Sequence, residues 1–333
     1  MNLFLTWFAS AIQYGTVILY GAMGEIITEK AGHLNLGTPG IMVFGGAFGF
    51  LSGFLYENSC TAAGTEPNAF LMLMLTLFVS FLAGVIAGGI YSFLTITLHA
   101  NQNVAGLTLT TFAVGMAKFM AAFFIPKGQV SIRAAVASRL YGAHIPGLSD
   151  IPVVGKLFFS YGFMVYLAVI LAIGMMLILN KTRVGLNLRA IGESPATADA
   201  AGIPVTKYKY LAIAVGSGIS GLGGAFYLLD INNGGWSTQT GSELQGFGWL
   251  AVALVIFAVW KSVQAIWGAY LFGLCYWAYQ YLPALLNIKV STDLARMLPY
   301  VVTIIVLILI SLRKKRENQA PAALGLSYFR EDR

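Results

Sequence analysis

The chain has 333 residues, of which 58% are hydrophobic and 10% are charged, with 20 basic residues against 13 acidic ones. Soluble domains carry roughly 25% charged residues, so this composition excludes an ordinary soluble protein. Several apolar runs exceed the ~18–20 residues that cross a bilayer as a helix, and alternating strands of the barrel type are absent. We therefore expect an all-α, polytopic integral membrane protein.

The apolar runs predict a helical bundle of about nine transmembrane helices, within a range of eight to ten. The predicted spans cover 3–23, 38–55, 69–98, 103–124, 157–179, 208–230, 247–262, 263–282 and 297–312. Residues 1–312 form a single transmembrane domain in this interpretation, and residues 313–333 form a basic tail.

The positive charge lies mainly in two short segments, because residues 180–209 and 313–333 hold 11 of the 20 Lys and Arg residues. Basic residues beside the ends of spans are typical of the cytoplasmic side, so we expect both segments in the cytoplasm. The charge then needs no nucleic-acid partner. Counting membrane crossings from the cytoplasmic segment 180–209 places the linker 125–156 outside. Its stretch VSIRAAVASRLYGA is expected to form an amphipathic helix on the membrane surface.

Residues 24–42, GEIITEKAGHLNLGTPGIM, are too polar and too rich in Gly and Pro for one continuous helix, yet they lie between two apolar runs. Broken backbone inside a membrane is tolerated where it lines a cavity, and transporters often have binding groups there. We expect a broken or re-entrant segment, with a plain cytoplasmic turn as the alternative. Glu25 and Glu29, one helical turn apart, are interpreted as a solvated pair near the inner boundary. The candidates for a substrate pathway are Glu25, Asn35, Gly37, Asn101 and Asn103.

Glycines recur at helical spacing inside the predicted spans, where small residues let helix backbones approach closely. The glycines assigned to helix packing are Gly45, Gly49, Gly53, Gly84, Gly88, Gly218 and Gly221. Together with Gly216, the last two form a G-x-G-x-x-G pattern, but no strand precedes it, so a dinucleotide site is not expected. The chain has no G-x-x-x-x-G-K-[ST] phosphate loop, so any ATP that drives transport would be hydrolysed on another polypeptide.

Sequence signatures of an enzyme or a metal site are absent. The chain has no G-x-S-x-G or H-E-x-x-H motif, and its two cysteines and three histidines share no ligand spacing. We therefore expect a chain that is not an enzyme, binds no metal and has no cofactor of its own.

The polar segment 180–209 contains a short helix whose two ends are both specified by sequence. Ser194 is a good N-cap, and Pro195 fits the first helical position, where its missing N–H costs nothing. Residues 196–201 follow, Gly202 can adopt the left-handed conformation that ends a helix, and a proline stands two residues later. Such a helix on the aqueous face of a membrane protein is expected to contact another protein.

The order and content of four stretches resemble the permeases of bacterial ABC importers. These stretches are GEIITEKAGHLNLGTPGIM (24–42), NQNVAGLTLTTFAVG (101–115), LRAIGESPATADAAGIPV (188–205) and GSGISGLGGAFY (216–227). The chain is most similar to the simple-sugar and nucleoside group, and more distantly to ribose and branched-chain amino-acid permeases, over residues 20–310. It departs from the family pattern at Thr38, where the family usually has an acid, and at His33, where it usually has a hydrophobic residue. These departures leave the substrate open.

The resemblance implies a set of partners in a bacterial plasma membrane: a second homologous permease, cytoplasmic ATP-binding subunits that carry ATP and Mg, and an extracytoplasmic lipoprotein that captures solute. It also implies that residues 193–202 are the coupling helix, which lies in a groove of the ATPase. The residues expected to serve this coupling are Arg189, Glu193, Ser194, Pro195, Asp199 and Gly202.

The expected function is ATP-driven import of a small polar solute by alternating access. A nucleoside is favoured, because it needs stacking surface and hydrogen bonds more than charge, and ionisable residues are scarce in the spans. A simple-sugar importer permease is the first alternative. An autonomous secondary transporter or channel is the second, although such proteins commonly carry ionisable residues in mid-span.

Overall fold

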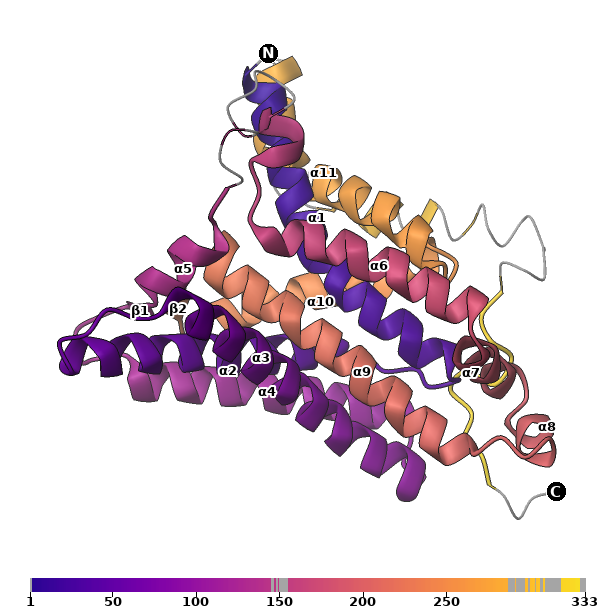
Figure 1. Cartoon of the computed structure of the whole chain (residues 1–333). Helices are drawn as coiled ribbons and strands as arrows, with labels where there is room; N and C mark the ends of the chain where they lie inside the picture. The colour runs from indigo at the N-terminus through magenta and orange to yellow at the C-terminus, as the bar shows by residue number, and fades with distance from the viewer. Residues whose placement is uncertain are drawn as a thin grey trace.

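A computed structural model describes residues 2–144, 155–286 and 319–329, with isolated positions at 147, 149 and 291 and several between 297 and 308. Eight long helices form the bundle (Figure 1). Their bounds are α1 (Asn2–Lys30), α2 (Thr38–Ala62), α3 (Ala69–Ser92), α4 (Gln102–Phe124), α6 (Phe163–Lys181), α9 (Val205–Phe226), α10 (Thr240–Phe257) and α11 (Ser262–Leu286). The shorter elements are the helices α5 (Ala135–Tyr141), α7 (Arg183–Glu193) and α8 (Pro195–Ala200), the π-helical turns η1 (Phe93–Thr97), η2 (Gly155–Phe159) and η3 (Tyr227–Ile231), and the strands β1 (Ser131–Arg133) and β2 (Gly235–Ser237).

The expected all-α membrane architecture is confirmed, because seven of the described helices are long and apolar enough to cross a bilayer. These are α1, α2, α3 with η1, α4, α6, α9 with η3, and α10. Helix α11 covers the eighth predicted span, and half of the ninth, 297–312, lies outside the described residues. The predicted number of about nine spans is therefore not confirmed.

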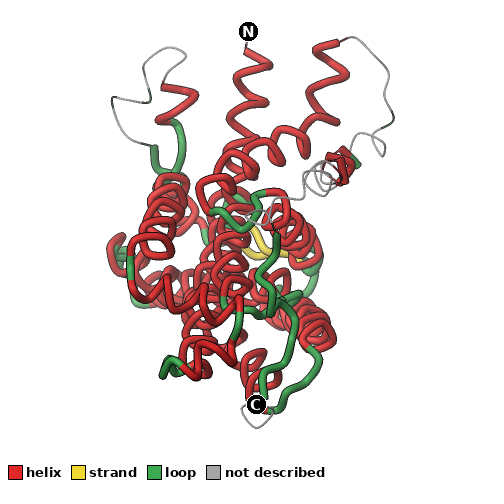
Figure 2. The backbone as a smooth tube through the Cα atoms, turned by 90° about the vertical axis from the view of Figure 1, so that its right-hand side faces the viewer, coloured by secondary structure: helices red, strands yellow, loops and turns green. Residues whose placement is uncertain are grey.

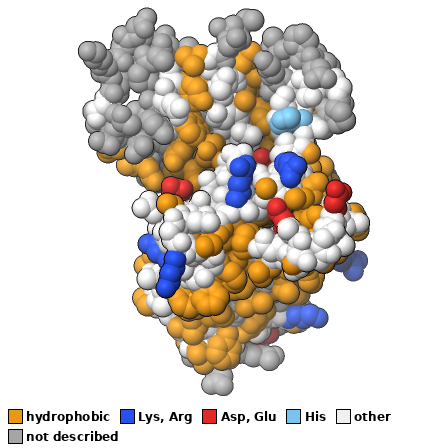
Figure 3. Space-filling model, turned by 90° about the vertical axis from the view of Figure 1, so that its left-hand side faces the viewer, with side chains coloured by type: hydrophobic (Ala, Val, Ile, Leu, Met, Phe, Trp, Pro, Cys, Tyr) orange, Lys and Arg blue, Asp and Glu red, His pale blue; other side chains and the backbone are white. Residues whose placement is uncertain are grey.

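Helices α2 and α9 lie at the centre of the bundle and are buried over most of their length, whereas α3, α4 and α6 present apolar side chains outward. Phe70 of α3 is 72% exposed and Phe123 of α4 is 74% exposed. Figure 3 shows apolar side chains over broad areas of one face, with charged residues scattered between them. A soluble protein rarely exposes such large apolar areas, so these faces suit lipid or another membrane subunit.

Close approach of helix backbones explains how the centre is packed. At each of the seven glycines assigned to helix packing, an added Cβ would come within 3.0 Å of an atom of another helix: Gly45, Gly49, Gly53, Gly84, Gly88, Gly218 and Gly221. On Gly45 of α2 that Cβ would lie 2.3 Å from the Cα of Gly221 on α9. On Gly84 of α3 it would lie 2.3 Å from the carbonyl oxygen of Ser217, also on α9. The glycines therefore bring α2, α3 and α9 into backbone contact.

The two ends of the bundle differ (Figure 1). Helices α7 and α8 form one end, called here the α7–α8 end, and the paired strands β1 and β2 lie at the opposite end. Hydrogen bonds join the C-terminal segment 319–329 to the α7–α8 end, because the amide of Ala323 donates to the carbonyl of Gly192 and the amide of Gly325 to that of Gly32. Figure 2 looks onto this end, where the C-terminal segment crosses the helix ends.

The prediction of an amphipathic surface helix at 130–143 is wrong. Residues 131–133 form β1, which pairs antiparallel with β2 so that Ile132 lies opposite Trp236. The following helix α5 has only seven residues, and its Tyr141 is buried and hydrogen-bonds Thr76 of α3 at 2.9 Å. The carboxylate of Glu57 accepts from the amide of Val136 at 3.0 Å and holds the first turn of α5. The apolar side of this stretch thus packs on protein and not on lipid.

Candidate functional site

Helix α8 has the ends that its sequence predicts. The hydroxyl of Ser194 accepts from the amide of Thr197 as the N-cap, and Pro195 opens the helix. At the other end Gly202 has φ of +82°, its amide donates to the carbonyl of Asp199 at 2.9 Å, and the amide of Ile203 donates to that of Ala198. This left-handed termination turns the chain sharply into α9.

Helix α7 is amphipathic and lies on the end of the bundle. Leu188 and Ile191 are buried, Arg189 is half-buried, and Glu193 at its last position is exposed. The Nε atom of Arg189 is buried without a hydrogen-bond partner among the described residues. One face of α7 therefore packs inward, and its last residue faces solvent beside α8.

The junction of α7 and α8 touches the end of α1. A Cβ on Gly192 would lie 2.3 Å from the carbonyl oxygen of Lys30, so the two backbones are in contact. A small apolar cluster of Ile191, Ala198 and Val205 then links α7, α8 and the first turn of α9. Packed atoms therefore connect α8 to α9, and connect the α7–α8 junction to the end of α1.

The break expected within residues 24–42 is narrower than that range, because α1 continues to Lys30 and α2 begins at Thr38. Glu25 holds the connecting turn, since its carboxylate accepts from the amide of Asn35 at 2.9 Å and from the hydroxyl of Thr38. The side chain of Asn35 accepts in turn from the amide of Gly37 at 3.0 Å. Polar side chains thus satisfy the irregular backbone, as burial requires.

Helices α3 and α4 complete this network. The side-chain carbonyl of Gln102, at the start of α4, accepts from the amide of Leu34 at 2.8 Å, and Tyr91 of α3 donates to the carbonyl of Leu34 at 2.7 Å. Thr110 of α4 donates to the carbonyl of Leu36 at 3.1 Å. The turn is therefore fastened to two other helices, α3 and α4.

The proposed pathway residues fall into two groups. Glu25, Asn35 and Gly37 are buried, and Glu25 and Asn35 serve the turn as hydrogen-bond acceptors. Asn101 and Asn103 are exposed at the start of α4, where Asn101 caps the helix by accepting from the amides of Asn103 and Val104. The sequence missed Gln102, which lies between them and points inward; its position next to two polar exposed residues carried no signal of this role.

The interpretation of Glu25 and Glu29 as a solvated pair is wrong, since their side chains are 0% and 2% exposed. Glu29 accepts a hydrogen bond from the indole of Trp260, which stands in the turn between α10 and α11. A buried carboxylate is tolerated only when hydrogen bonds replace its water. This pair therefore ties α1 to the α1–α2 turn and to the α10–α11 turn.

Gln102 and Asn103 offer a matched test of the network. Replacing Gln102 by leucine leaves the buried amide of Leu34 without its acceptor, which should lower the free energy of unfolding by about 1–3 kcal/mol. Replacing the exposed Asn103 by leucine should change it by less than about 0.5 kcal/mol. Thermal unfolding of the two purified variants in the same detergent would measure the difference. Equal losses would contradict the assigned role of Gln102.

The fold and this site define a class: a polytopic α-helical membrane protein with a capped polar helix fastened to the ends of its spans. The comparisons with known proteins agree with this class. The family model of the branched-chain amino acid transport system permease component matches residues 8–307. The chain therefore belongs to this family of ABC transporter permeases, whose members are transport subunits and associate with ATP-binding subunits and a substrate-binding protein.

Several curated relatives cover nearly the whole chain. The nucleoside ABC transporter permease protein NupC of Lactococcus lactis is 32% identical, over 97% of this chain and 96% of its own length. The guanosine ABC transporter permease protein NupQ of Bacillus subtilis is 30% identical, over 97% and 96%. The putative glucose ABC transporter permease protein TsgC13 of Haloferax volcanii is 31% identical, over 97% of both chains. No solved structure matches the chain.

Proposed function

We propose that this chain is the membrane-spanning subunit of an ATP-driven importer that moves a nucleoside across a bacterial plasma membrane by alternating access. The observation that carries the coupling part of the proposal is the packed contact from α8 through Gly192 to the end of α1. In this proposal the α7–α8 end and the segment 319–329 face the cytoplasm. The partners are a second homologous permease, an extracytoplasmic lipoprotein, and ATP-binding subunits that hold ATP and Mg²⁺.

The mechanism follows from the contacts of α8. Closure of the ATP-binding subunits would push on α8, and the cluster of Ile191, Ala198 and Val205 would pass that movement to the first turn of α9. The contact of Gly192 with Lys30 would pass it to the α1–α2 turn. Because glycines bring the backbones of α2, α3 and α9 into direct contact, a movement of α9 would reach α2 and α3 through packed atoms.

A group of aromatic side chains supports a nucleoside as the solute. Tyr14 of α1 lies 4.9 Å from Trp277 of α11 between ring centres, and Phe247 of α10 lies 4.9 Å from Tyr276 of α11. Tyr227 extends the group and donates a hydrogen bond to Glu243 at 3.1 Å. Tyr14, Tyr276 and Trp277 are half-buried, so parts of these rings reach the surface. Aromatic faces are worth roughly 1–3 kcal/mol per stacked base.

Two relatives named for nucleoside or guanosine transport support the same solute, and the relative named for glucose keeps a simple sugar as the second candidate. Both candidates are neutral and polar. The planar base distinguishes a nucleoside from a simple sugar, because stacking on aromatic side chains stabilises a bound base more than a bound sugar ring.

Uptake by the complete transporter tests the proposal. In cells that express this chain with its neighbouring transporter genes, we expect uptake of labelled guanosine, adenosine or uridine that depends on ATP. Excess unlabelled nucleoside should compete, and excess glucose or ribose should not. Competition by sugars alone would show that the solute is a sugar and not a nucleoside. Solute flux through liposomes that contain this chain alone, without ATP, would overturn the importer mechanism in favour of an autonomous transporter.

A further inference from the structure

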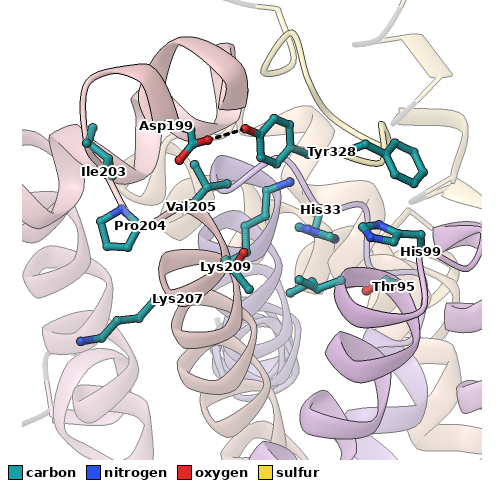
Figure 4. Close-up of a pocket in the computed structure, with 14 residues that line it drawn as sticks. His33, Thr95, His99, Asp199, Ile203, Pro204, Val205, Lys207, Lys209 and Tyr328 are labelled. Carbon is teal, nitrogen blue, oxygen red and sulfur yellow. Dashed lines mark hydrogen bonds between the residues drawn. The ribbon is translucent and has the colours of Figure 1, made fainter. Parts of the chain in front are cut away.

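A cavity of about 920 Å³ lies at the α7–α8 end, between the first turn of α9, the end of α3 and the C-terminal segment (Figure 4). Its volume is that of a small-molecule site. The cavity is separate from the aromatic group of α1, α10 and α11, because none of those residues lines it. It therefore needs its own explanation.

His33, from the α1–α2 turn, lines this cavity without any hydrogen-bond partner. Its side chain is 2% exposed, and both ring nitrogens are buried with no acceptor or donor among the described residues. Burial, with the positive charge of Lys209 nearby, lowers the pKa of His33 to about 3. The ring is therefore neutral at physiological pH and can donate one hydrogen bond and accept another. Leaving buried polar groups unpaired is unfavourable, so a ligand that hydrogen-bonds this ring would recover that loss.

Lys209, on the first turns of α9, places a cation beside His33. Its side chain is 3% exposed, and its Nζ atom lies 6.0 Å from the centre of the Tyr328 ring. In the described part of the chain no acid forms an ion pair with Lys209. Figure 4 shows Lys209 and His33 directed into the same space, while Lys207 extends away from it. Asp199, the acid that lines the cavity, instead accepts a hydrogen bond from Tyr328 at 2.9 Å.

The N-terminus of α9 adds a third attraction for an anion. Residues 204–207 line the cavity, and no side chain caps this end of a helix that is 22 residues long. Free amide groups and the helix dipole at such an end favour a phosphate or another anion. The amides, the cation and the unpartnered imidazole therefore meet at one cavity.

Aromatic surface stands on the other side of the same cavity. The ring of Phe329 lies 4.4 Å from the ring of His99 between centres, and Tyr328 lines the cavity beside them. A ligand that places a phosphate near Lys209 and His33 can lay a planar ring on this surface. Inorganic phosphate alone would leave the aromatic side unfilled.

We propose that this cavity binds a small phosphorylated compound with a planar ring, of the nucleoside monophosphate type, with its phosphate on Lys209, His33 and the first turn of α9. Because the ligand would bridge α9, the α1–α2 turn and the C-terminal segment, its binding holds the α7–α8 end in the described arrangement. The proposal goes beyond transport itself and does not require that the imported solute be a nucleoside.

Binding to the purified full-length chain tests the proposal. In nanodiscs of phosphatidylcholine, labelled GMP or AMP should bind saturably, and adenosine and inorganic phosphate should bind at least about 10-fold more weakly. Lys209→Gln should weaken GMP binding about 10-fold or more, and His33→Leu should weaken it about 5-fold or more. Lys181→Gln removes the same charge from an exposed residue at the end of α6, outside the cavity, and should change the affinity less than about 3-fold. Unchanged elution on size-exclusion chromatography would show that each variant is folded.

Three outcomes would overturn the proposal. The first is an absence of saturable nucleotide binding by the folded wild-type chain. The second is an equal loss in the Lys181 and Lys209 variants, because that would indicate only diffuse charge. The third is Lys209-dependent binding of phosphatidylglycerol in mixed nanodiscs without nucleotide binding, because the site would then hold a lipid headgroup. Uptake by the complete transporter is unaffected by these outcomes, so failure here leaves the proposed function standing.

Discussion

Replacing Gly202 by valine should reduce ATP-driven uptake by at least about 10-fold while the chain remains folded in the membrane. Gly202 has φ of +82°, where a β-branched residue is strained by about 1–3 kcal/mol. The same position is exposed, and a Cβ there would meet no atom within 4 Å, so the change does not disturb the core. Relief of the strain requires the end of α8 to rearrange, which would separate α8 from the partner that drives it. Uptake and ATP hydrolysis by the complete transporter measure the loss.

Asparagine at the same position supplies the control, because it tolerates the left-handed conformation far better than valine does. Gly202→Asn should therefore retain most of the uptake. Normal uptake with valine would contradict the coupling role of α8. Equal losses with valine and asparagine would also contradict it in this form, since the effect would then follow from side-chain bulk and not from backbone strain.

Helix α8 was predictable from sequence because its determinants are local. Ser194 caps an amide three residues away, and the helix ends at Gly202 through backbone hydrogen bonds that lie within residues 198–203. Local capping interactions of this kind can be predicted from the sequence. The glycine spacing in α2, α3 and α9 was visible for the same reason, although the sequence did not say which helices meet.

The network around the α1–α2 turn was not predictable because its partners are distant. Gln102 binds the amide of Leu34 from 68 residues away, and Trp260 binds Glu29 from 231 residues away. From the sequence, Gln102 is equivalent to its polar neighbours Asn101 and Asn103, and Glu29 resembles any carboxylate near the end of a span. Only the packing of α1, α4 and the α10–α11 turn distinguishes a buried acceptor from a solvated one.

The prediction of a surface helix at 130–143 was wrong for a related reason. An amphipathic pattern indicates that one face of a helix is buried, but it does not indicate whether lipid or protein covers that face. Here protein covers that side, because Ile132 of β1 pairs with Trp236 of β2 and Tyr141 hydrogen-bonds Thr76. The strand itself has three residues, which is too short for an alternating pattern to reveal.

Replacing Gly84 by valine should have the largest effect on stability. A Cβ there would lie 2.3 Å from the carbonyl oxygen of Ser217 and 3.1 Å from the Cα of Gly218, and both are backbone atoms of α9 that cannot turn aside. Helices α3 and α9 must then separate, which would also break the hydrogen bond from Ser80 to the carbonyl of Gly221. We expect a loss of about 3 kcal/mol and a Tm lower by about 5–10 °C.

Gly89, on the same helix, provides the matched control, because a Cβ there meets no atom within 4 Å. Gly89→Val adds the same bulk and the same β-branching to α3, so it isolates the contact with α9 from the intrinsic preference of the helix. Its Tm should stay within about 2 °C of the wild type. The two thermal unfolding curves, measured in one detergent with monodisperse protein, decide the matter. A stable Gly84→Val variant would mean that α3 and α9 are not held at backbone contact, and a movement of α9 would then not reach α3 through packed backbone atoms.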